Sequence, residues 1–266
     1  MNLITKSTLP LIEYRHVSVM RSGRMVLNDI SIAIRLGEHV AIVGPNGSGK
    51  SSLVKTITRE LYPYTETQGS YLRIMGKDRW NVFELRSLLG VVSNELLEGR
   101  ARDFSGREVM LSGFFSSSRI WRHQQVTPFM KQKVNEVLEL LEITHLNDRR
   151  ISEMSTGEAR RFLIGRALVH EPKALVLDEP TSSLDMRATI ELHTILQKIA
   201  AEGTSIIMVT HQLPDIISEI KRVILIKKGK IVEDGIKENI LTSASLSRLF
   251  GIPVDVVKHN GHYQLL

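Results

Sequence analysis

A glycine-rich segment that ends in lysine and serine offers the clearest chemistry in this sequence. This segment, the phosphate loop, comprises Gly44, Pro45, Asn46, Gly47, Ser48, Gly49, Lys50, Ser51 and Ser52. Its glycines permit backbone angles that a side chain would forbid, so successive N–H groups can point at a polyphosphate. Lys50 would reach the β- and γ-phosphates, and the Ser51 hydroxyl would ligate Mg²⁺. The pattern therefore predicts a nucleotide-binding loop between a strand and a helix.

Two adjacent carboxylates, Asp178 and Glu179, follow the apolar run of residues 175–177. A strand of this kind exposes its carboxyl end to the ligand crevice of the sheet. There Asp178 is suited to hold Mg²⁺ through water, and Glu179 to orient or deprotonate the water that attacks a γ-phosphate. An Asp-Glu pair alone indicates a strand-end turn or a helix cap. The phosphate loop upstream favours the catalytic interpretation.

The segment Ser155, Thr156, Gly157 and Glu158 precedes a predicted helix. Its Ser-x-x-Glu spacing is typical of a capping box, which is a structural role. Its functional interpretation is a second helix N-terminus directed at phosphate. The order of the motifs along the chain favours the functional interpretation. The phosphate loop precedes this segment, and Asp178 with Glu179, then Asp185, then His211 follow it.

Hydrophobic periodicity predicts a mixed α/β chain with a helical insert. The predicted strands are 11–20, 26–36, 40–43, a pair at 69–74 and 90–92, then 174–177, 205–209 and a hairpin of 223–227 with 230–233. The predicted helices are 50–61, 157–170, 186–201 and one whose buried stripe is Phe129, Met130, Val134, Val137, Leu138 and Leu141. A polar spacer is expected at 242–247. The pattern divides the chain into an α/β core (1–92 and 161–242), a helical subdomain (93–160) and a C-terminal extension (243–266).

Composition excludes several kinds of site but selects no partner. The 266 residues include no cysteine, which excludes disulfides, thiol catalysis and cysteine-based metal sites. No apolar run approaches the length of a membrane span, and residues 1–10 lack the apolar core of a signal peptide. The net charge of +6 is compatible with nucleic acid, anionic lipid or acidic ligands.

The order of the motifs resembles the nucleotide-binding subunit of the ABC ATPases, over residues 11 to about 241. The resemblance implies a P-loop NTPase core with an antiparallel β edge and an inserted helical subdomain. Matched residue by residue, Lys50 and Ser51 resemble the phosphate-loop pair, Asp178 and Glu179 the Walker B carboxylates, Met154 to Glu158 the signature motif, Asp185 the D-loop and His211 the switch histidine.

In that family two subunits pair head to tail, and each ATP lies between one phosphate loop and the other subunit's signature helix. The resemblance therefore implies a homodimer that uses ATP and Mg²⁺. It assigns catalysis to Glu179 and His211, and nucleotide contacts to Ser155, Gly157, Glu158 and Asp185.

Three positions depart from the family pattern. Asn94 occupies the Q-loop position, where the family usually has glutamine; its shorter amide would contact Mg²⁺ or the catalytic water only with a closer backbone. Arg21 stands near the usual adenine-stacking aromatic and can stack through its guanidinium, with Tyr14 as the weaker substitute. Thr156 adds bulk beside the expected γ-phosphate. Because Lys50 and Glu179 are retained, active hydrolysis is expected.

Weaker resemblances to particular ATPase subgroups indicate which kind of transporter the chain would serve. Residues 246–254 and 259–263 resemble the end of ATPases that serve iron-chelate and cobalamin importers, and residues 104–121 resemble molybdenum-transport or photorepair ATPases. These likenesses imply the ATPase subunit of a metal or metal-chelate importer, placed on the inner face of the cell membrane. Its expected partners are a substrate-binding protein and a separate transmembrane permease, for which residues 94–122 would form much of the docking surface.

Two other classes stay open at this point. One is a soluble ABC ATPase that acts on nucleic acid or the ribosome, which the basic balance and the aromatic, arginine-containing segment 112–122 permit. A loop tucked onto the helical subdomain is the favoured interpretation of that segment. The other class is a P-loop kinase, which explains the phosphate loop but leaves His211 without a role.

Overall fold

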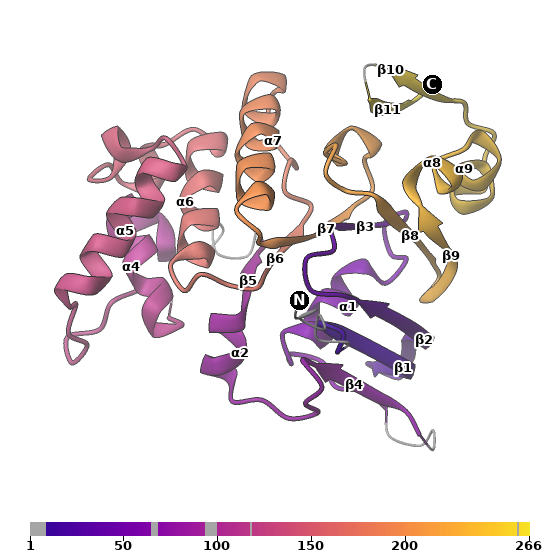
Figure 1. Cartoon of the computed structure of the whole chain (residues 1–266), viewed down its shortest axis with the longest axis horizontal. Coiled ribbons are helices and arrows are strands. Elements are labelled where there is room, and N and C mark those ends of the chain that lie inside the picture. Colours follow the sequence, from indigo (N-terminus) through magenta and orange to yellow (C-terminus); the bar gives the residue numbers. More distant parts are fainter. Residues whose placement is uncertain (1–8, 65–68, 94–99, 118, 260) are drawn as a thin grey trace, which may run out of the picture.

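A six-stranded sheet runs through the middle of the molecule, which the computed structural model describes for residues 9–64, 69–93, 100–117, 119–259 and 261–266 (Figure 1). The strands are β1 (Ile12–Arg21), β2 (Arg24–Ile34), β3 (Val40–Val43), β4 (Tyr71–Ile74), β5 (Leu89–Val92), β6 (Ala174–Asp178), β7 (Ser205–Thr210), β8 (Arg222–Lys227), β9 (Lys230–Ile236), β10 (Val256–His259) and β11 (His262–Leu265). The helices are α1 (Lys50–Ile57), α2 (Val82–Leu88), α4 (Gly106–Ser112), α5 (Pro128–Leu140), α6 (Thr156–Leu168), α7 (Met186–Ala201), α8 (Lys237–Ile240), α9 (Ser243–Phe250) and the short 3₁₀ turns η1 (Arg100–Asp103), η2 (Gly113–Phe115), η3 (Thr144–Leu146), η4 (Ile151–Glu153) and η5 (Leu213–Asp215).

The topology of the central sheet brings three strand ends together. Its order is β5-β6-β7-β3-β8-β9, with β3 parallel to both β7 and β8 and only β9 antiparallel to its neighbour. Val43 at the end of β3 is aligned with Thr210, and Asp178 at the end of β6 is aligned with Val209. The phosphate loop, Glu179 and His211 therefore leave the sheet at one edge, where such sheets bind ligands.

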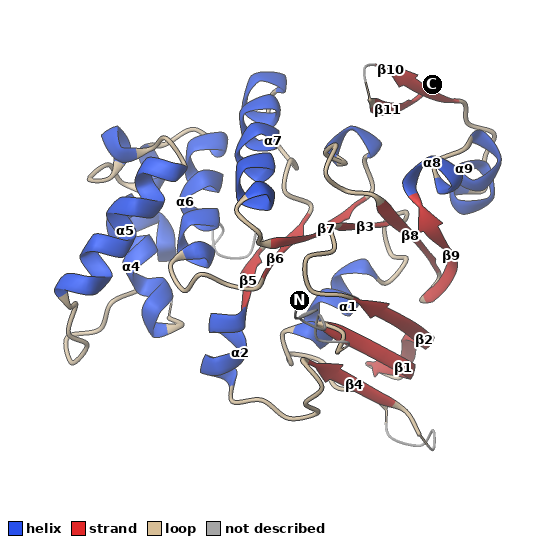
Figure 2. Ribbon diagram, in the orientation of Figure 1, coloured by secondary structure: helices blue, strands red, loops and turns tan. Residues whose placement is uncertain are grey.

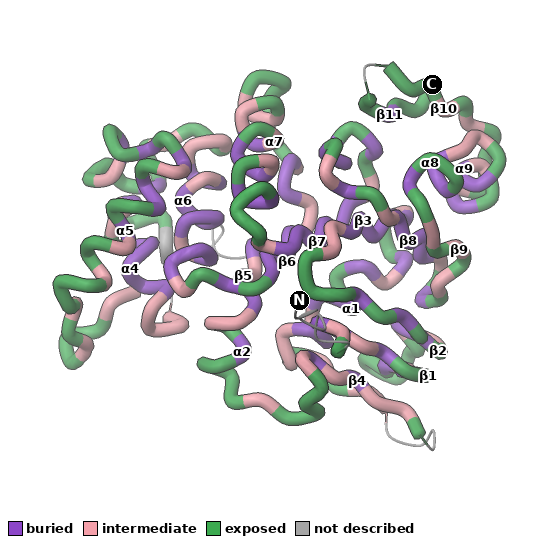
Figure 3. The backbone as a smooth tube through the Cα atoms, viewed as in Figure 1, coloured by how far each residue is buried: buried purple, intermediate pink, exposed green. Residues whose placement is uncertain are grey.

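Both faces of the central sheet are buried, which explains the uninterrupted apolar run of β3. Val40 and Ile42 face a core shared with α1 and with the antiparallel sheet β2-β1-β4. Ala41 and Val43 face the opposite core, which extends into α4 to α7. Figure 3 shows the resulting line of buried backbone through the centre of the molecule.

Helices α4, α5 and α6 gather at one end of the molecule, away from the β1, β2 and β4 sheet (Figure 2). Their packing is close, because a Cβ added to Gly106 would lie 2.2 Å from the ring of Phe162. No helix among the described residues is long and apolar enough to cross a membrane. The predicted boundary between residues 160 and 161 falls inside α6, and the three-part division stays a prediction.

Most predicted elements are confirmed, and two coincide residue for residue with β3 and α7. The predicted pairing of strands 69–74 and 90–92 is wrong, because β4 pairs with β1 and β5 pairs with β6. The polar spacer at 242–247 is also wrong. Thr242 caps a helix there, α9, whose Leu246 and Leu249 are buried.

Two details of the predicted helices need correction. The helix predicted to reach residue 61 ends at Ile57, since Arg59 adopts a positive φ of 63° and donates to the carbonyls of Leu72 and Asp78. Phe129, predicted on the buried stripe of α5, is 69% exposed. It lies in the first helical turn, just after the Thr127 cap and Pro128, where the helix extends past the core.

Tyr14 has a structural role, which corrects its suggested use as an adenine-stacking ring. Its side chain is buried in the core, and its hydroxyl donates to Leu53 O at 3.1 Å and lies 2.7 Å from Thr56 Oγ1. Burial raises the pKa of the Tyr14 phenol above its ordinary value, so the hydroxyl stays neutral. This contact joins β1 to the helix that follows the phosphate loop.

Tyr14→Phe is expected to lower the free energy of unfolding by about 1–2 kcal/mol, because Thr56 and Leu53 lose a buried hydrogen-bond partner. The unfolding midpoint in urea measures this change. Tyr62→Phe is the control, since Tyr62 is 68% exposed. The affinity for ATP should be unchanged in both variants. A tenfold weaker affinity in Tyr14→Phe would instead give the Tyr14 hydroxyl a role in nucleotide binding.

Candidate active site

The phosphate loop has a backbone that only glycine accommodates at two positions. A Cβ on Gly44 would lie 2.3 Å from the carbonyl oxygen of Ile226, so β8 approaches too closely for any side chain. Gly49, which begins α1, has a φ of +109° and would place a Cβ 2.8 Å from Val26 O. The loop is therefore held from both sides, by β8 and by β2, with its helix beginning directly after it.

Lys50 is folded back over the loop. Its side chain is 5% exposed, and its ammonium donates to Gly44 O at 2.8 Å and to Pro45 O at 3.1 Å. Burial lowers the pKa of Lys50, while the nearby Glu179 and Asp178 carboxylates raise it. Ser48 is also buried, and its hydroxyl makes no hydrogen bond. The loop thus offers a buried cation and an uncommitted hydroxyl, which fit a phosphate ligand.

Asp178 and Ser51 supply oxygen donors beside this loop. Burial raises the pKa of the Asp178 carboxyl, and the hydrogen bond from the Ser51 side chain opposes that rise. Its Oδ1 atom is buried without a hydrogen-bond partner. A buried, unpartnered carboxylate oxygen next to a serine hydroxyl fits a hard divalent cation such as Mg²⁺. Among the described residues, no group of three or more His, Asp or Glu side chains is arranged to hold a metal.

Glu179 and His211 meet at the rim of the loop. His211 Nδ1 lies 3.0 Å from Glu179 Oε1, and Lys50 Nζ lies 3.7 Å from the same oxygen. Glu179 has a positive φ of 49°, a conformation that costs a non-glycine residue about 1–3 kcal/mol. The pair remains half-buried and open to a ligand. A carboxylate placed in this way can accept a proton from a water at the loop, with the imidazole beside it.

A second cluster forms where α6 and α7 begin. Ser155 and Glu158 make a full capping box, in which Glu158 accepts from Ser155 N–H at 2.8 Å and donates its own N–H to Ser155 Oγ at 3.3 Å. Asp185 caps α7 by accepting from Ala188 N–H at 2.8 Å. A Cβ on Gly157 would lie 2.7 Å from Ala188 Cβ. The first turn of α6 is thus packed directly on the first turn of α7.

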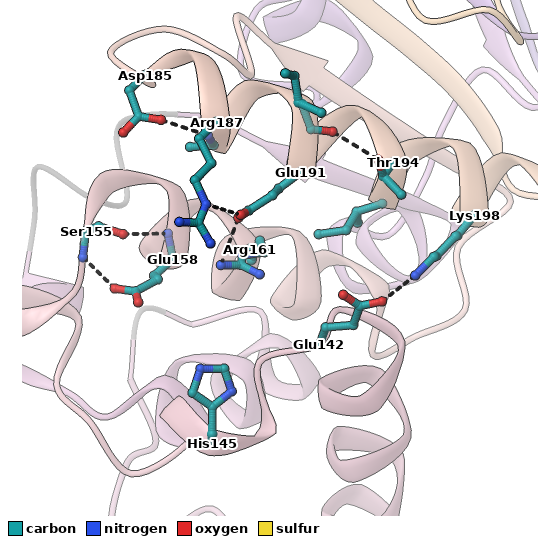
Figure 4. A pocket seen from close by; sticks show the side chains of 13 residues that line it. Glu142, His145, Ser155, Glu158, Arg161, Asp185, Arg187, Glu191, Thr194 and Lys198 are labelled. Atoms are coloured by element: carbon teal, nitrogen blue, oxygen red, sulfur yellow. Dashed lines mark hydrogen bonds and ion pairs between the residues drawn. The ribbon is translucent and has the colours of Figure 1, made fainter.

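Beside this cluster lies a cavity of about 580 Å³, the α6–α7 groove (Figure 4). It is lined by Glu142, His145, Ser155, Glu158, Arg161, Asp185, Arg187, Ala188, Ile190, Glu191, Thr194, Ile195 and Lys198. Glu191 pairs with Arg187 at 2.9 Å and with Arg161 at 3.5 Å, and Lys198 pairs with Glu142 at 2.5 Å. Of these pairs, Arg161–Glu191 joins α6 to α7, Arg187–Glu191 lies within α7, and Lys198–Glu142 joins α7 to the segment after α5.

The predicted site residues therefore fall into two clusters. The phosphate loop, Asp178, Glu179 and His211 form one, and Ser155, Gly157, Glu158 and Asp185 form the other. Thr156, noted above for its bulk, donates to Ser183 O at 3.2 Å within the second cluster. Ala188 was not singled out in the sequence. The small side chain at position 188, three residues after Asp185, was the only feature of the sequence that could have indicated a close contact there.

Arg21 and Asn94 were also predicted to contact the ligand. Arg21 is exposed at the end of β1, opposite Arg24 in the hairpin, so its guanidinium is accessible to a ligand. Asn94 lies outside the described residues. Their assigned roles in binding the base and the metal stay predictions.

Comparison with known proteins identifies the family. The family model described as "ABC transporter" matches residues 27–182. A putative ABC transporter ATP-binding protein of Streptococcus mutans is 30% identical over 255 residues, which cover 94% of this chain and 95% of that protein. The hemin import ATP-binding protein HmuV of Aliivibrio fischeri is 31% identical over 255 residues, covering 93% of each chain.

Solved structures agree with this result. The structure of cbiO1 from Clostridium perfringens, part of the ABC transporter complex cbiONQ, superposes with a TM-score of 0.76 at 25% identity, covering 90% of this chain and 94% of that chain. A putative metal-chelate type ABC transporter in an inward-facing conformation matches with a TM-score of 0.79 at 22% identity, over 97% of this chain and 98% of that chain, which supports the fold. The chain therefore belongs to the ABC transporter family, as an ATP-binding and ATP-hydrolysing subunit.

Proposed function

We propose that this chain powers an importer of a metal chelate or a related substrate, acting as a head-to-tail homodimer on a separate membrane-spanning permease. The observation that carries the importer assignment is the similarity to HmuV, which extends over 93% of both chains. In this proposal the subunit is bound peripherally at the inner face of the membrane, where cytoplasmic ATP reaches it. A substrate-binding protein on the other side would deliver the substrate.

The phosphate loop and Lys50 would hold the ATP phosphates. The N–H groups of Asn46, Gly47, Gly49, Lys50, Ser51 and Ser52 would donate to the phosphate oxygens. The N–H groups of Gly44 and Ser48 instead donate to Thr210 O and Pro45 O and hold the loop in shape. Pro45 contributes no N–H but directs the loop. Arg21 would stack on the adenine through its guanidinium plane.

Ser51 and Asp178 are the residues that would hold Mg²⁺, with Asn94 as a third donor. When bound, the ion would neutralise charge on the β- and γ-phosphate oxygens. The unpartnered Oδ1 of Asp178 and its Ser51 hydrogen bond support this assignment. Glu179 would orient the attacking water and accept its proton, while His211 holds the Glu179 carboxylate and contacts the γ-phosphate.

The α6 cluster supports the dimer. Ser155, Gly157 and Glu158 occupy a helix N-terminus whose positive end attracts a phosphate. In the proposed dimer, this N-terminus faces the phosphate loop of the second copy, and Asp185 lies between the two sites. Each ATP would then need both subunits.

The proposed permease contact is a groove of about 440 Å³ between α2 and α6, lined in part by Arg86, Ser116 and Arg166. Exposed aromatic side chains lie near it: Phe83 is 62% exposed on α2, and Trp121 is 45% exposed and donates to Ser117, which also lines the groove. Exposed aromatic side chains of this kind are typical of protein interfaces. The groove overlaps the described part of segment 94–122.

Affinity purification of the tagged chain from gently solubilised cells, at low and high salt, tests the proposal by mass spectrometry. We expect one multi-span membrane protein in stoichiometric amount. Phe83→Asp and Trp121→Asp should release it, whereas Phe129→Asp, at a 69% exposed site on α5, should retain it. Recovery with nucleic acid or ribosomes and no membrane partner would replace the importer by a soluble ATPase.

A further inference from the structure

A buried carboxylate outside the two clusters connects the segments that carry Glu179 and His211. Asp215 ends η5 and is 2% exposed. Its Oδ1 accepts from the Thr181 hydroxyl at 2.5 Å, and its Oδ2 accepts from the Thr210 hydroxyl. Both threonines are buried as well, at 6% and 0% exposure. All three side chains are thus removed from water, and Asp215 is bonded to both threonines.

The two threonines are neighbours of the catalytic pair in the chain. Thr181 follows Glu179 by two residues, and Thr210 directly precedes His211. The Thr210 hydroxyl also accepts from the N–H of Gln212 at 2.9 Å, and the Thr210 carbonyl accepts from Gly44 N–H at 3.3 Å. Asp215 therefore links three segments: the one carrying Glu179, the one carrying His211, and the start of the phosphate loop.

The backbone at Glu179 needs such an anchor. Its positive φ of 49° persists only where the surrounding structure enforces it. On one side, the Glu179 N–H donates to Val209 O at 2.8 Å. On the other side, Thr181 is fixed by Asp215. With either anchor lost, the chain at Glu179 can relax toward an ordinary conformation and turn its carboxylate away from His211.

We propose that Asp215 is a positioning residue for ATP hydrolysis, which sets the 3.0 Å contact between Glu179 and His211 through Thr181 and Thr210. The inference rests on the proposed roles of Glu179 and His211. A carboxylate suits this task because it accepts from both hydroxyls, and because bonds to a charged acceptor are short and strong. An amide would present a donor to one threonine, and the Thr210 hydroxyl already accepts from Gln212.

The test compares near-isosteric variants of the linker with a matched buried control. Thr181→Val and Asp215→Asn should lower kcat by about 10- to 100-fold, the size expected from an ångström-scale displacement of a catalytic group. The dissociation constant for ATP should stay within about threefold of the wild-type value. Thr181→Ser restores the hydroxyl and should recover kcat. Ser205→Ala removes a buried hydroxyl at the other end of β7 and should leave kcat unchanged.

Activity is expressed per nucleotide-binding site, so that loss of folded protein is not counted as loss of rate. Unchanged kcat in both Thr181→Val and Asp215→Asn would overturn the proposal, as would equal losses in these variants and in Ser205→Ala. Glu179→Gln is measured in parallel. If Glu179→Gln is inactive while the Asp215 variant is fully active, only the role of Asp215 fails; if Glu179→Gln turns over normally, the proposed function of Glu179 fails.

Discussion

Glu179→Gln is expected to stop ATP hydrolysis while ATP binding persists. Glutamine preserves the size of the side chain and an oxygen for His211 at 3.0 Å, but it cannot accept the proton of the attacking water. Loss of a general base lowers kcat by about 10²- to 10⁴-fold. Release of inorganic phosphate measures the rate. Size-exclusion chromatography with ATP should show a dimer that does not dissociate, because its nucleotide is not consumed.

The control for this variant is Glu202→Gln, since Glu202 is exposed just after α7, at the opposite end of β7 from His211. Its kcat should equal that of the unmodified protein. Steady turnover by Glu179→Gln would remove Glu179 from the proposed role and leave the hydrogen bond to His211 as a structural contact.

Lys50→Met is expected to weaken ATP binding by at least about 10- to 100-fold, and hydrolysis falls with it. The ammonium is the buried cation of the phosphate loop, and a hydrogen bond to a charged partner contributes about 1.5–3 kcal/mol. Methionine occupies the same volume without charge, so the fold should be retained. Calorimetric titration with ATP measures the affinity.

The matched control is Lys77→Met, which removes a lysine that stacks on Trp80 in the β4–α2 connection. Its affinity for ATP should not change. Wild-type affinity in Lys50→Met would show that the loop backbone alone holds the nucleotide. The Lys50 ammonium would then be left with its contacts to Gly44 O, Pro45 O and Glu179.

The local hydrophobic pattern was sufficient to locate a strand or helix wherever that pattern was long and regular. The uninterrupted apolar run of β3 indicates a strand buried on both faces, and the long amphipathic pattern of α7 between Asp185 and Gly203 marks both helix ends. By contrast, α2 was missed because Leu85 is its one buried residue among those described. α9 was missed because serines dominate its sequence, although Leu246 and Leu249 have helical spacing.

Strand pairing could not be predicted from the sequence. β4 and β5 both read as strands, yet they join different sheets, because β1 and β6 offer them their hydrogen-bonding edges. Tyr14 shows the same limit for side chains. Its type suits base stacking, and only the fold reveals that its hydroxyl is committed to Leu53 and Thr56 in the core.

The residues of the candidate site could be picked out because phosphate chemistry requires fixed residue types at fixed spacings. The residues that hold these site residues in place could not be identified from the sequence. Asp215 lies four residues after His211 in a segment without a chemical pattern, and its bonds to Thr181 and Thr210 depend on tertiary packing. Likewise, Gly157 was read as part of a motif, whereas its contact with Ala188 explains why no side chain fits there.

Mixing two inactive variants tests most directly the central claim that each ATP site is shared by two copies of the chain. Lys50→Met disables the loop, and Ser155→Arg blocks the α6 N-terminus with an exposed side chain. Each variant alone should be inactive, whereas an equal mixture should recover up to about a quarter of the wild-type rate, because each mixed dimer has one intact pair. A mixture as inactive as its parts, or full activity of Ser155→Arg alone, would contradict the shared site.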